Sequence, residues 1–372
     1  MVSITFKAQW EGVREGFKSP VLHVELIQST PFFFDFSNRI SSAKYNLFIP
    51  KELIFFLKFE GISLNIIEGD FAPMSLDALI GRRIDSKDLI RIMQTNAADQ
   101  ISYYNQLKKI PNLDSNVPEN ISAEGDDILI KISPDRPQSL ISSITKIIAL
   151  LNKFKAVPLK KLRDQRLPDT IALYEKAFDV IVKENEKVAL PYKSWNVNGT
   201  RYTDLFNTSL YYKAIDIIYH LMGSFTPGIV HGNFYFENVI RSKNNLIIIN
   251  PRSSFGNGPS ILGDPRCDLS KIRVSTRGVL NCIDKGAFLV YRCEGDSIDY
   301  DILGAYDRDI PLQLVNKYAE SVGIDPLELD LFEGSIYLLS MGLFNENLKK
   351  RLIYMEALKL LVPALEKFSS VF

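Results

Sequence analysis

Four polar residues flank one predicted β-hairpin in the middle of the chain: His231, Asn233, Asn238 and Asn250. The segment 228–256 predicts a loop, a strand, a turn and a second strand, so the loop before the first strand and the end of the second lie at the same edge. We therefore expect the four side chains to converge. Phosphoryl transfer needs such a cluster, because one group orients the acceptor hydroxyl and takes its proton while oxygen ligands hold Mg²⁺ across the phosphates.

Three motifs in this region occur in a family-like order. HGNFYFEN at 231–238 resembles the His-Gly-Asp-x-x-x-x-Asn catalytic loop of the aminoglycoside phosphotransferase and choline kinase family, a branch of the protein-kinase-like fold. IINPRSSFG, ending at Gly256, and GDPRCDLSKI at 263–272 resemble the motifs that follow in phosphotransferase-like proteins of capsular and surface polysaccharide gene clusters. Together these motifs are far more specific than a lone glycine-rich loop, and the resemblance covers about 85–372.

This resemblance implies a fold and an activity. The implied fold is α+β and two-lobed, with a small mixed β/α lobe and a large, mainly helical lobe that carries the catalytic hairpin. The implied activity is ATP-dependent phosphorylation of a small-molecule hydroxyl, on a sugar, an amino alcohol or a polysaccharide precursor, with ATP and Mg²⁺ as cofactors.

The same resemblance gives individual residues a role. Asn233 stands where the family has its catalytic aspartate, Asn238 is the family's metal-binding asparagine, and Asn250 stands where the family has its main Mg²⁺-binding aspartate. Two of these positions have thus lost a carboxylate. An amide can hydrogen-bond a hydroxyl but cannot accept its proton, and it is a poorer Mg²⁺ ligand than a carboxylate. We interpret His231 as a residue that organises the loop rather than as a base.

The predicted small lobe departs from the family in the same direction. Kinase-like enzymes hold the α- and β-phosphates with a strand lysine that pairs with a helix glutamate. By position, the strand DLIRIM offers Arg91 and the helix DQISYY offers Gln100, with Asp99 as the less favoured alternative. An experimenter who wanted to inactivate an enzyme would also exchange Asp for Asn, but the additional departures at Arg91 and Gln100 favour a natural origin.

Three charged residues near the hairpin leave two interpretations each. Arg252 could reach a phosphate or an acidic substrate, and the slightly favoured alternative is a salt bridge to Asp264 or Asp268. The two aspartates could supply a missing carboxylate or bind metal, but a loop brace or a helix cap is the favoured interpretation.

The periodicity of apolar residues predicts the domain organisation. Residues 1–75 predict a strand-rich region of unknown role with one short helix, 76–137 the small lobe, and 138–372 a large lobe that is helical except for 228–256. The strands of the hairpin are expected at 238–241 and 246–250, and a helix is also predicted over 170–185.

An alternative site in the first region has little support. FFFDFSNRI resembles the strand of haloacid-dehalogenase-like phosphatases that ends in a nucleophilic aspartate, here Asp35. That chemistry needs a second carboxylate two residues later, where this chain has Ser37.

Composition limits the other classes of protein. The 44 Lys and Arg residues balance the 44 Asp and Glu residues, which argues against nucleic acid as a partner bound by charge alone. The three cysteines make no disulfide framework, and no apolar run has the length of a signal peptide or a membrane span, so we expect a cytoplasmic protein without membrane insertion. The oligomeric state is not encoded in a readable way.

Two functions follow from these observations. In the first, the chain transfers phosphate to a small-molecule hydroxyl, with activity that is impaired or lost. In the second, it is a pseudokinase, which keeps the fold and a nucleotide or ligand site, or acts as a scaffold, without transfer activity.

Overall fold

The computed structural model describes part of the 372-residue chain, and the ranges follow. They are 5–13, 20–28, 45–47, 63–64, 82–86, 89–92, 97–132, 140–157, 192–223, 226–242, 245–252, 261–284, 286, 288–302 and 309–369. By internal contacts the chain forms two units, which we describe separately. One unit comprises Met1–Ser75, Ser194–Tyr202 and Gly278–Asp307, and the other comprises Leu76–Lys193, Thr203–Arg277 and Arg308–Phe372.

The first unit contains a four-stranded sheet near the N-terminus. Strand β1 pairs antiparallel with β2 and parallel with β4, and β3 pairs with the other edge of β2. The strands are β1 (Thr5–Val13), β2 (Pro20–Gln28), β3 (Tyr45–Leu47) and β4 (Ser63–Leu64). Asp35 and the short helix expected in this region lie outside the described residues.

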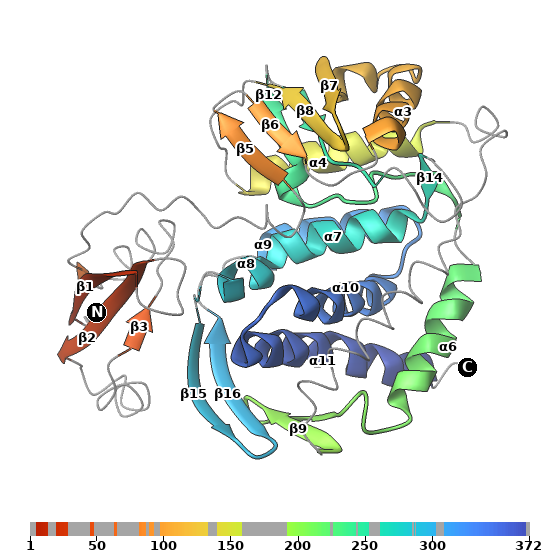
Figure 1. Ribbon diagram of the computed structural model, residues 1–372. Coiled ribbons are helices and arrows are strands. Elements are labelled where there is room, and N and C mark those ends of the chain that lie inside the picture. Colours follow the sequence, from red (N-terminus) through yellow and green to blue (C-terminus); the bar gives the residue numbers. More distant parts are fainter. Residues whose placement is uncertain are drawn as a thin grey trace. The chain divides into compact units, whose positions relative to one another are not determined.

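A second sheet of this unit corrects the sequence prediction. Its strand order is β10-β9-β16-β15, in a stretch where we expected helices only (Figure 1). The elements are β9 (Ser194–Val197), β10 (Thr200–Thr203), α8 (Val279–Asp284), β15 (Phe288–Glu294) and β16 (Ser297–Ile302). In β16 half-buried and buried residues alternate strictly, which is the period of a strand and not of a helix. The β9–β10 turn is Asn198-Gly199, and both residues have positive φ, as a tight two-residue hairpin turn requires.

The second unit begins with an antiparallel sheet of order β5-β6-β8-β7, accompanied by helix α3. Its elements are β5 (Arg82–Ser86), β6 (Leu89–Ile92), α3 (Ala97–Lys108), β7 (Asn120–Glu124) and β8 (Asp127–Lys131). The strands around 88–93 and 126–133 and the helix between them were expected from the sequence, and the structure confirms them.

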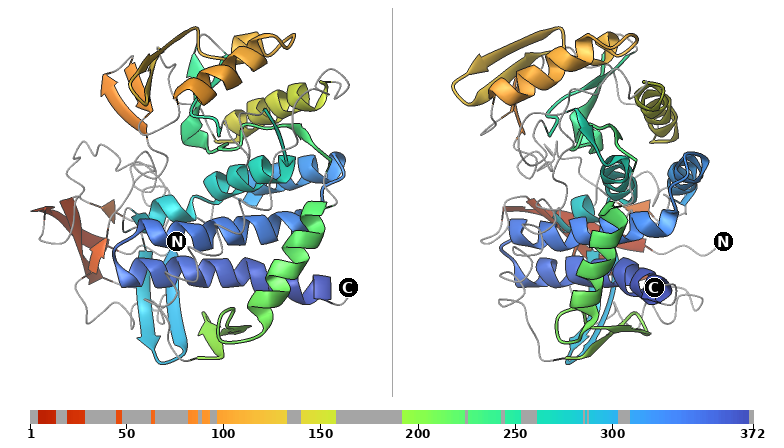
Figure 2. Two further views of the ribbon diagram at one scale, coloured as in Figure 1. Left: turned by 45° about the vertical axis from the view of Figure 1, so that its right-hand side comes forward. Right: turned by 90° about the vertical axis from the view of Figure 1, so that its right-hand side faces the viewer.

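The rest of this unit is mainly helical, and α10 packs against both α11 and α7 (Figures 1 and 2). The helices are α4 (Leu140–Lys155), α6 (Leu210–Gly223), α7 (Pro265–Arg277), α9 (Asp309–Ser321), α10 (Pro326–Ser340) and α11 (Asn347–Ser369). The helix expected at 170–185 lies outside the described residues. In the part of the chain that the structure describes, no helix is both long and apolar enough to cross a membrane.

The predicted hairpin is present among these helices. It consists of β12 (Val239–Ser242) and β13 (Asn245–Ile248), close to the expected bounds, and a short pair, β11 (Gly228–Ile229) with β14 (Leu262–Gly263), lies beside it in the sequence. A mixed sheet with one helix, followed by helices that enclose this hairpin, gives the α+β class and the order of elements expected for the kinase-like fold. That fold prediction is confirmed.

Strand β13 explains how the hairpin is anchored. Ile247 and Ile249 belong to the core of the small sheet, together with Ile92 and Ile128, whereas Ile248 belongs to the core of the helical part. A strand buried on both faces reads as an unbroken apolar run, as it does here. Residue 250 therefore follows a segment that two cores hold in place.

Candidate functional site

His231 organises the loop before the hairpin. The side chain is completely buried, its Nε2–H donates to the carbonyl oxygen of Ile249 at 2.9 Å, and its Nδ1 accepts the backbone N–H of Asn233 at 3.3 Å. These two bonds require one neutral tautomer. Burial lowers the pKa of the imidazole to about 3, and the charge of Lys271 acts in the same direction. A ring with both nitrogens occupied and so low a pKa is not available as a base.

The three asparagines predicted as site residues come together with Gln100 in one hydrogen-bonded group, which we call the carboxamide cluster. The Nδ2 of Asn233 donates to the carbonyl oxygen of Asn250 at 3.2 Å, and the Nδ2 of Asn238 donates to the carbonyl oxygen of Asn233 at 2.8 Å. The Nε2 of Gln100 donates to the Oδ1 of Asn250 at 3.3 Å. All four side chains are neutral, and only Asn233 is more than slightly exposed.

Helix α3 fixes residue 250 from the other side. The hydroxyl oxygen of Tyr104 accepts the backbone N–H of Asn250 at 3.0 Å, and the hydroxyl of Tyr103 donates to the carbonyl oxygen of Val230 at 2.8 Å. Asn250 has φ +53°, a left-handed conformation that Asn tolerates better than most residues. Three consecutive polar positions on one helix face, 100, 103 and 104, thus join the small sheet's helix to the hairpin.

Helix α7 holds the loop through charged groups. The carboxylate of Asp268 accepts the backbone N–H of His231 at 2.6 Å on one oxygen and that of Gly232 at 2.7 Å on the other. Lys271, one turn later, donates to the carbonyl oxygen of Gly232. Burial raises the pKa of the Asp268 carboxyl to about 7, although the two N–H donors and Lys271 lower it. Asp268 is therefore the brace of this loop.

Asp264 serves the start of the same helix. It accepts the backbone N–H of Arg266 at 3.0 Å and a two-pronged ion pair from the guanidinium of that residue, with the shortest distance at 2.8 Å. Arg266 also pairs with Glu328 at 2.8 Å. Asp264 is an N-terminal cap whose charge is already matched.

Arg252 and Arg91 occupy different surroundings. Arg252 is exposed, and its backbone N–H donates to the carbonyl oxygen of His231 at 2.9 Å. Its charge is, after burial, a cause of the lowered pKa of Lys271, which is about 8. The backbone of Arg91 lies within β6, opposite Leu129 of β8, and its side chain lies outside the described part.

The site residues do not match a magnesium centre. The Oδ1 of Asn238 is buried without a hydrogen-bond partner among the described residues, as a metal ligand would be, but the Oδ1 of Asn250 receives the amide of Gln100. No group of three or more His, Cys, Asp and Glu side chains in the described ranges is arranged to hold a metal. Mg²⁺ in proteins is usually held by one or two carboxylates, and here one neutral oxygen is available.

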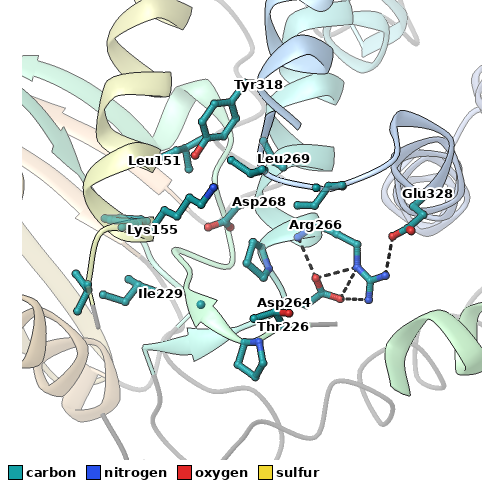
Figure 3. A pocket seen from close by; sticks show the side chains of 18 residues that line it. Leu151, Lys155, Thr226, Ile229, Asp264, Arg266, Asp268, Leu269, Tyr318 and Glu328 are labelled. Atoms are coloured by element: carbon teal, nitrogen blue, oxygen red, sulfur yellow. Dashed lines mark hydrogen bonds and ion pairs between the residues drawn. The ribbon is translucent and has the colours of Figure 1, made fainter. Parts of the chain in front are cut away.

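A cavity of about 430 Å³ lies beside the start of α7 (Figure 3). Asp264, Arg266 and Asp268 line it, whereas Asn233, Asn238 and Asn250 do not. Apolar side chains such as Leu151, Ile229 and Leu269 make up much of its wall. We therefore place the candidate site at the carboxamide cluster and not in this cavity.

Sequence reasoning missed Lys271, Tyr103 and Tyr104 as parts of the site. Lys271 was visible within the motif GDPRCDLSKI, at the spacing of one helical turn from Asp268, which is the signal that could have found it. The two tyrosines bind backbone groups more than a hundred residues away, and no spacing in the sequence predicts such contacts.

Comparisons with known proteins agree with the motifs. No family model and no curated protein matches the chain. Similar solved structures include an ADP-bound aminoglycoside phosphotransferase, APH(2'')-Ib, with 14% identity, a TM-score of 0.41 and coverage of 86% of this chain and 99% of that chain. An ethanolamine kinase of Plasmodium vivax has 10% identity, a TM-score of 0.41 and coverage of 96% and 84%. A glucosamine kinase has 11% identity, a TM-score of 0.37 and coverage of 96% and 94%. The named proteins are small-molecule kinases, and at such identities no residue's role is carried over from them.

Proposed function

We propose that this chain is a kinase-like protein of small-molecule phosphotransferase ancestry in which phosphoryl transfer to a hydroxyl is impaired or lost. The ancestral acceptor would be a hydroxyl of a sugar, an amino alcohol or a polysaccharide precursor. What the chain retains is a ligand-binding site, so it acts as a pseudokinase. The observation that carries this proposal is the absence of an available proton acceptor around Asn233 in the described part of the chain.

Each candidate for that proton acceptor is already committed. Asn233 is an amide, which cannot take a proton from a hydroxyl. Asp268 uses both oxygens to hold two backbone N–H groups, and Asp264 is paired with Arg266. His231 is neutral with both ring nitrogens bonded. Loss of a general base costs two to four orders of magnitude in rate, roughly, so any remaining transfer would be slow.

One observation favours a working enzyme as the second candidate. The Oδ1 of Asn238 is buried and has no hydrogen-bond partner among the described residues, which is costly unless a ligand supplies one. A protein that still transfers phosphate would keep such an atom for its cofactor. This candidate predicts turnover in the purified chain and its loss in Asn238→Ala.

An ATP-consumption assay with Mg²⁺ separates the two candidates. We expect no turnover above background for the natural sequence, and Mg²⁺-dependent turnover at least about 100-fold above it for the double variant Asn233→Asp/Asn250→Asp, because both carboxylates are restored. Asn152→Asp, at an exposed position of α4, is the matched control for adding a carboxylate and should stay at background. Equal turnover of the natural chain and the double variant would contradict the proposal.

A further inference from the structure

The charges around the loop 231–238 are distributed in an unusual way. The positions that the motif resemblance assigns to carboxylates, 233 and 250, are neutral, whereas two cations, Lys271 and Arg252, reach the loop backbone or its neighbourhood. We propose that this loop binds a phosphate group without a divalent cation, with Lys271 and Arg252 as its cationic partners. The inference rests on the proposed function, because it describes what the same site binds once transfer is lost.

Lys271 is placed rigidly beside residue 233. Its ammonium group donates to the carbonyl oxygen of Gly232, the atom that precedes Asn233 in the chain, and lies 5.5 Å from the ring centroid of Tyr235. With Asp268 on the N–H of Gly232, helix α7 therefore grips both polar groups of one residue. An ammonium has three N–H donors, and no second acceptor for Lys271 occurs among the described residues. The remaining donors of this half-buried side chain are available to a ligand.

Arg252 provides the second charge. Its backbone donates to the carbonyl oxygen of His231, so the loop fixes where the side chain starts, and the side chain is exposed to solvent. It lies close enough to Lys271 for its charge to disfavour the charged form of that residue. Two cations held near each other are destabilised by mutual repulsion, and a phosphate between them removes that repulsion. A guanidinium also matches phosphate oxygens in a two-pronged geometry.

The neutral amides make a metal unnecessary. In a site with two carboxylates, Mg²⁺ has to bridge the carboxylates and the phosphate oxygens, because all of these groups are negative. Here Asn233 and Asn250 carry no charge, so they do not repel a phosphate. Amide N–H groups are also hydrogen-bond donors, which is what a phosphate oxygen accepts.

Two negative groups oppose this binding, and neither outweighs the cations. Asp268 is buried against two backbone N–H donors, and its raised pKa, about 7, leaves it partly neutral at neutral pH. Glu237 is half-buried near Tyr235, where its charge contributes to the raised pKa of that phenol. The sum of Lys271, Arg252, Glu237 and Asp268 remains positive at pH 7.

The ligand class is a phosphate ester, which could be a nucleotide or a phosphorylated small molecule. Calorimetric titrations of the full chain with ATP, inorganic pyrophosphate and glucose 6-phosphate, in excess EDTA and in excess MgCl₂, test the proposal. We expect at least one of them to bind in EDTA as tightly as in Mg²⁺, or more tightly. Preference for ATP identifies a nucleotide site, and equal or tighter binding of glucose 6-phosphate identifies a phosphorylated small molecule.

Single substitutions connect that binding to the two cations. Lys271→Met and Arg252→Gln should each weaken binding in EDTA at least tenfold, while Lys271→Arg, which keeps the charge, should retain most of it. Lys317→Met, at an exposed position of α9, is the matched control and should leave binding unchanged. Arg252 is exposed, so its variant tests the proposal even if Lys271→Met disturbs the loop.

Asn250→Asp gives the sharpest test, because it adds one negative charge to the carboxamide cluster. We expect this variant to lose at least tenfold in affinity in EDTA and to recover in Mg²⁺. Binding by the natural chain that requires Mg²⁺, or that Asn250→Asp and both cation variants leave unchanged, would overturn the inference. So would a lack of binding of all three probes. The turnover assay of Asn233→Asp/Asn250→Asp decides the proposed function separately from these outcomes.

Discussion

The loop 231–238 is held on two sides by opposite kinds of chemistry. Toward α3 and the end of β13, its partners are amides and phenols, in the carboxamide cluster and at Tyr103 and Tyr104. Toward α7, its partners are the charged groups of Asp268 and Lys271. The difference teaches that charge has been kept where it holds backbone groups and is absent where the resemblance places transfer chemistry.

This contrast has an energetic meaning. A buried carboxylate that accepts two backbone N–H bonds secures the shape of a loop, because leaving either donor unpaired costs roughly 1–3 kcal/mol. Amide–amide bonds on the other side contribute less, about 1 kcal/mol each. The shape of the site thus depends on α7, and its electrostatic character depends on the carboxamide cluster. The two sides should respond differently to substitution.

The largest effect is expected from Asp268→Ala. The change leaves the backbone N–H groups of His231 and Gly232 buried without an acceptor, so the free energy of unfolding should fall by about 2–6 kcal/mol. Urea titration measures the change. Ser270→Ala, on the same helix, is the control, since the buried hydroxyl oxygen of Ser270 has no hydrogen-bond partner among the described residues, and this variant should differ by less than about 0.5 kcal/mol. A similar loss in both variants would show that the N–H bonds are not the cause.

A smaller effect concerns pH. Burial raises the pKa of Asp268 to about 7 in the folded chain, above the unfolded value of about 3.9, so between these values the folded state holds a proton that the unfolded state has lost. The stabilisation due to this proton is complete below about pH 4 and disappears as the pH rises through 7. The difference in free energy of unfolding between the natural chain and Asp268→Asn should therefore fall with rising pH, by up to about 1.4 kcal/mol per unit. Parallel pH profiles of the two proteins, measured by urea titration, would contradict this assignment.

The hairpin could be predicted from the sequence because its signals are local. The apolar run that precedes Asn250, with the polar residues at both ends of the hairpin, predicted strands within two residues of those observed. It also predicted that residues 233, 238 and 250 meet, and the structure joins them by hydrogen bonds. Short-range pairing in a hairpin needs little information from the rest of the fold.

Other features depend on contacts that are distant in the sequence. Strands β15 and β16 were missed because seven and six residues are too few for their alternation to stand out from the helical periodicity around them. The contact of Lys271 with Gly232 spans 39 positions, and it exists only because α7 packs against the loop. The sequence identified the right motif there without showing which residue reaches the loop.

The smallest effect is expected on the neutral side of the loop. Gln100 makes one long bond, 3.3 Å, to Asn250, and its own Oε1 is buried without a partner among the described residues. Replacing Gln100 by Leu removes that bond and also removes the unpaired oxygen, so the two terms nearly offset each other and stability should change by less than about 1 kcal/mol. Tyr104→Phe, one helical turn away, is the reference, because it leaves the backbone N–H of Asn250 without its acceptor and should cost about 1–3 kcal/mol. Thermal unfolding of the two variants tests this order. A greater loss for Gln100→Leu would mean that the carboxamide cluster, and not the tyrosine bond, joins α3 to the hairpin.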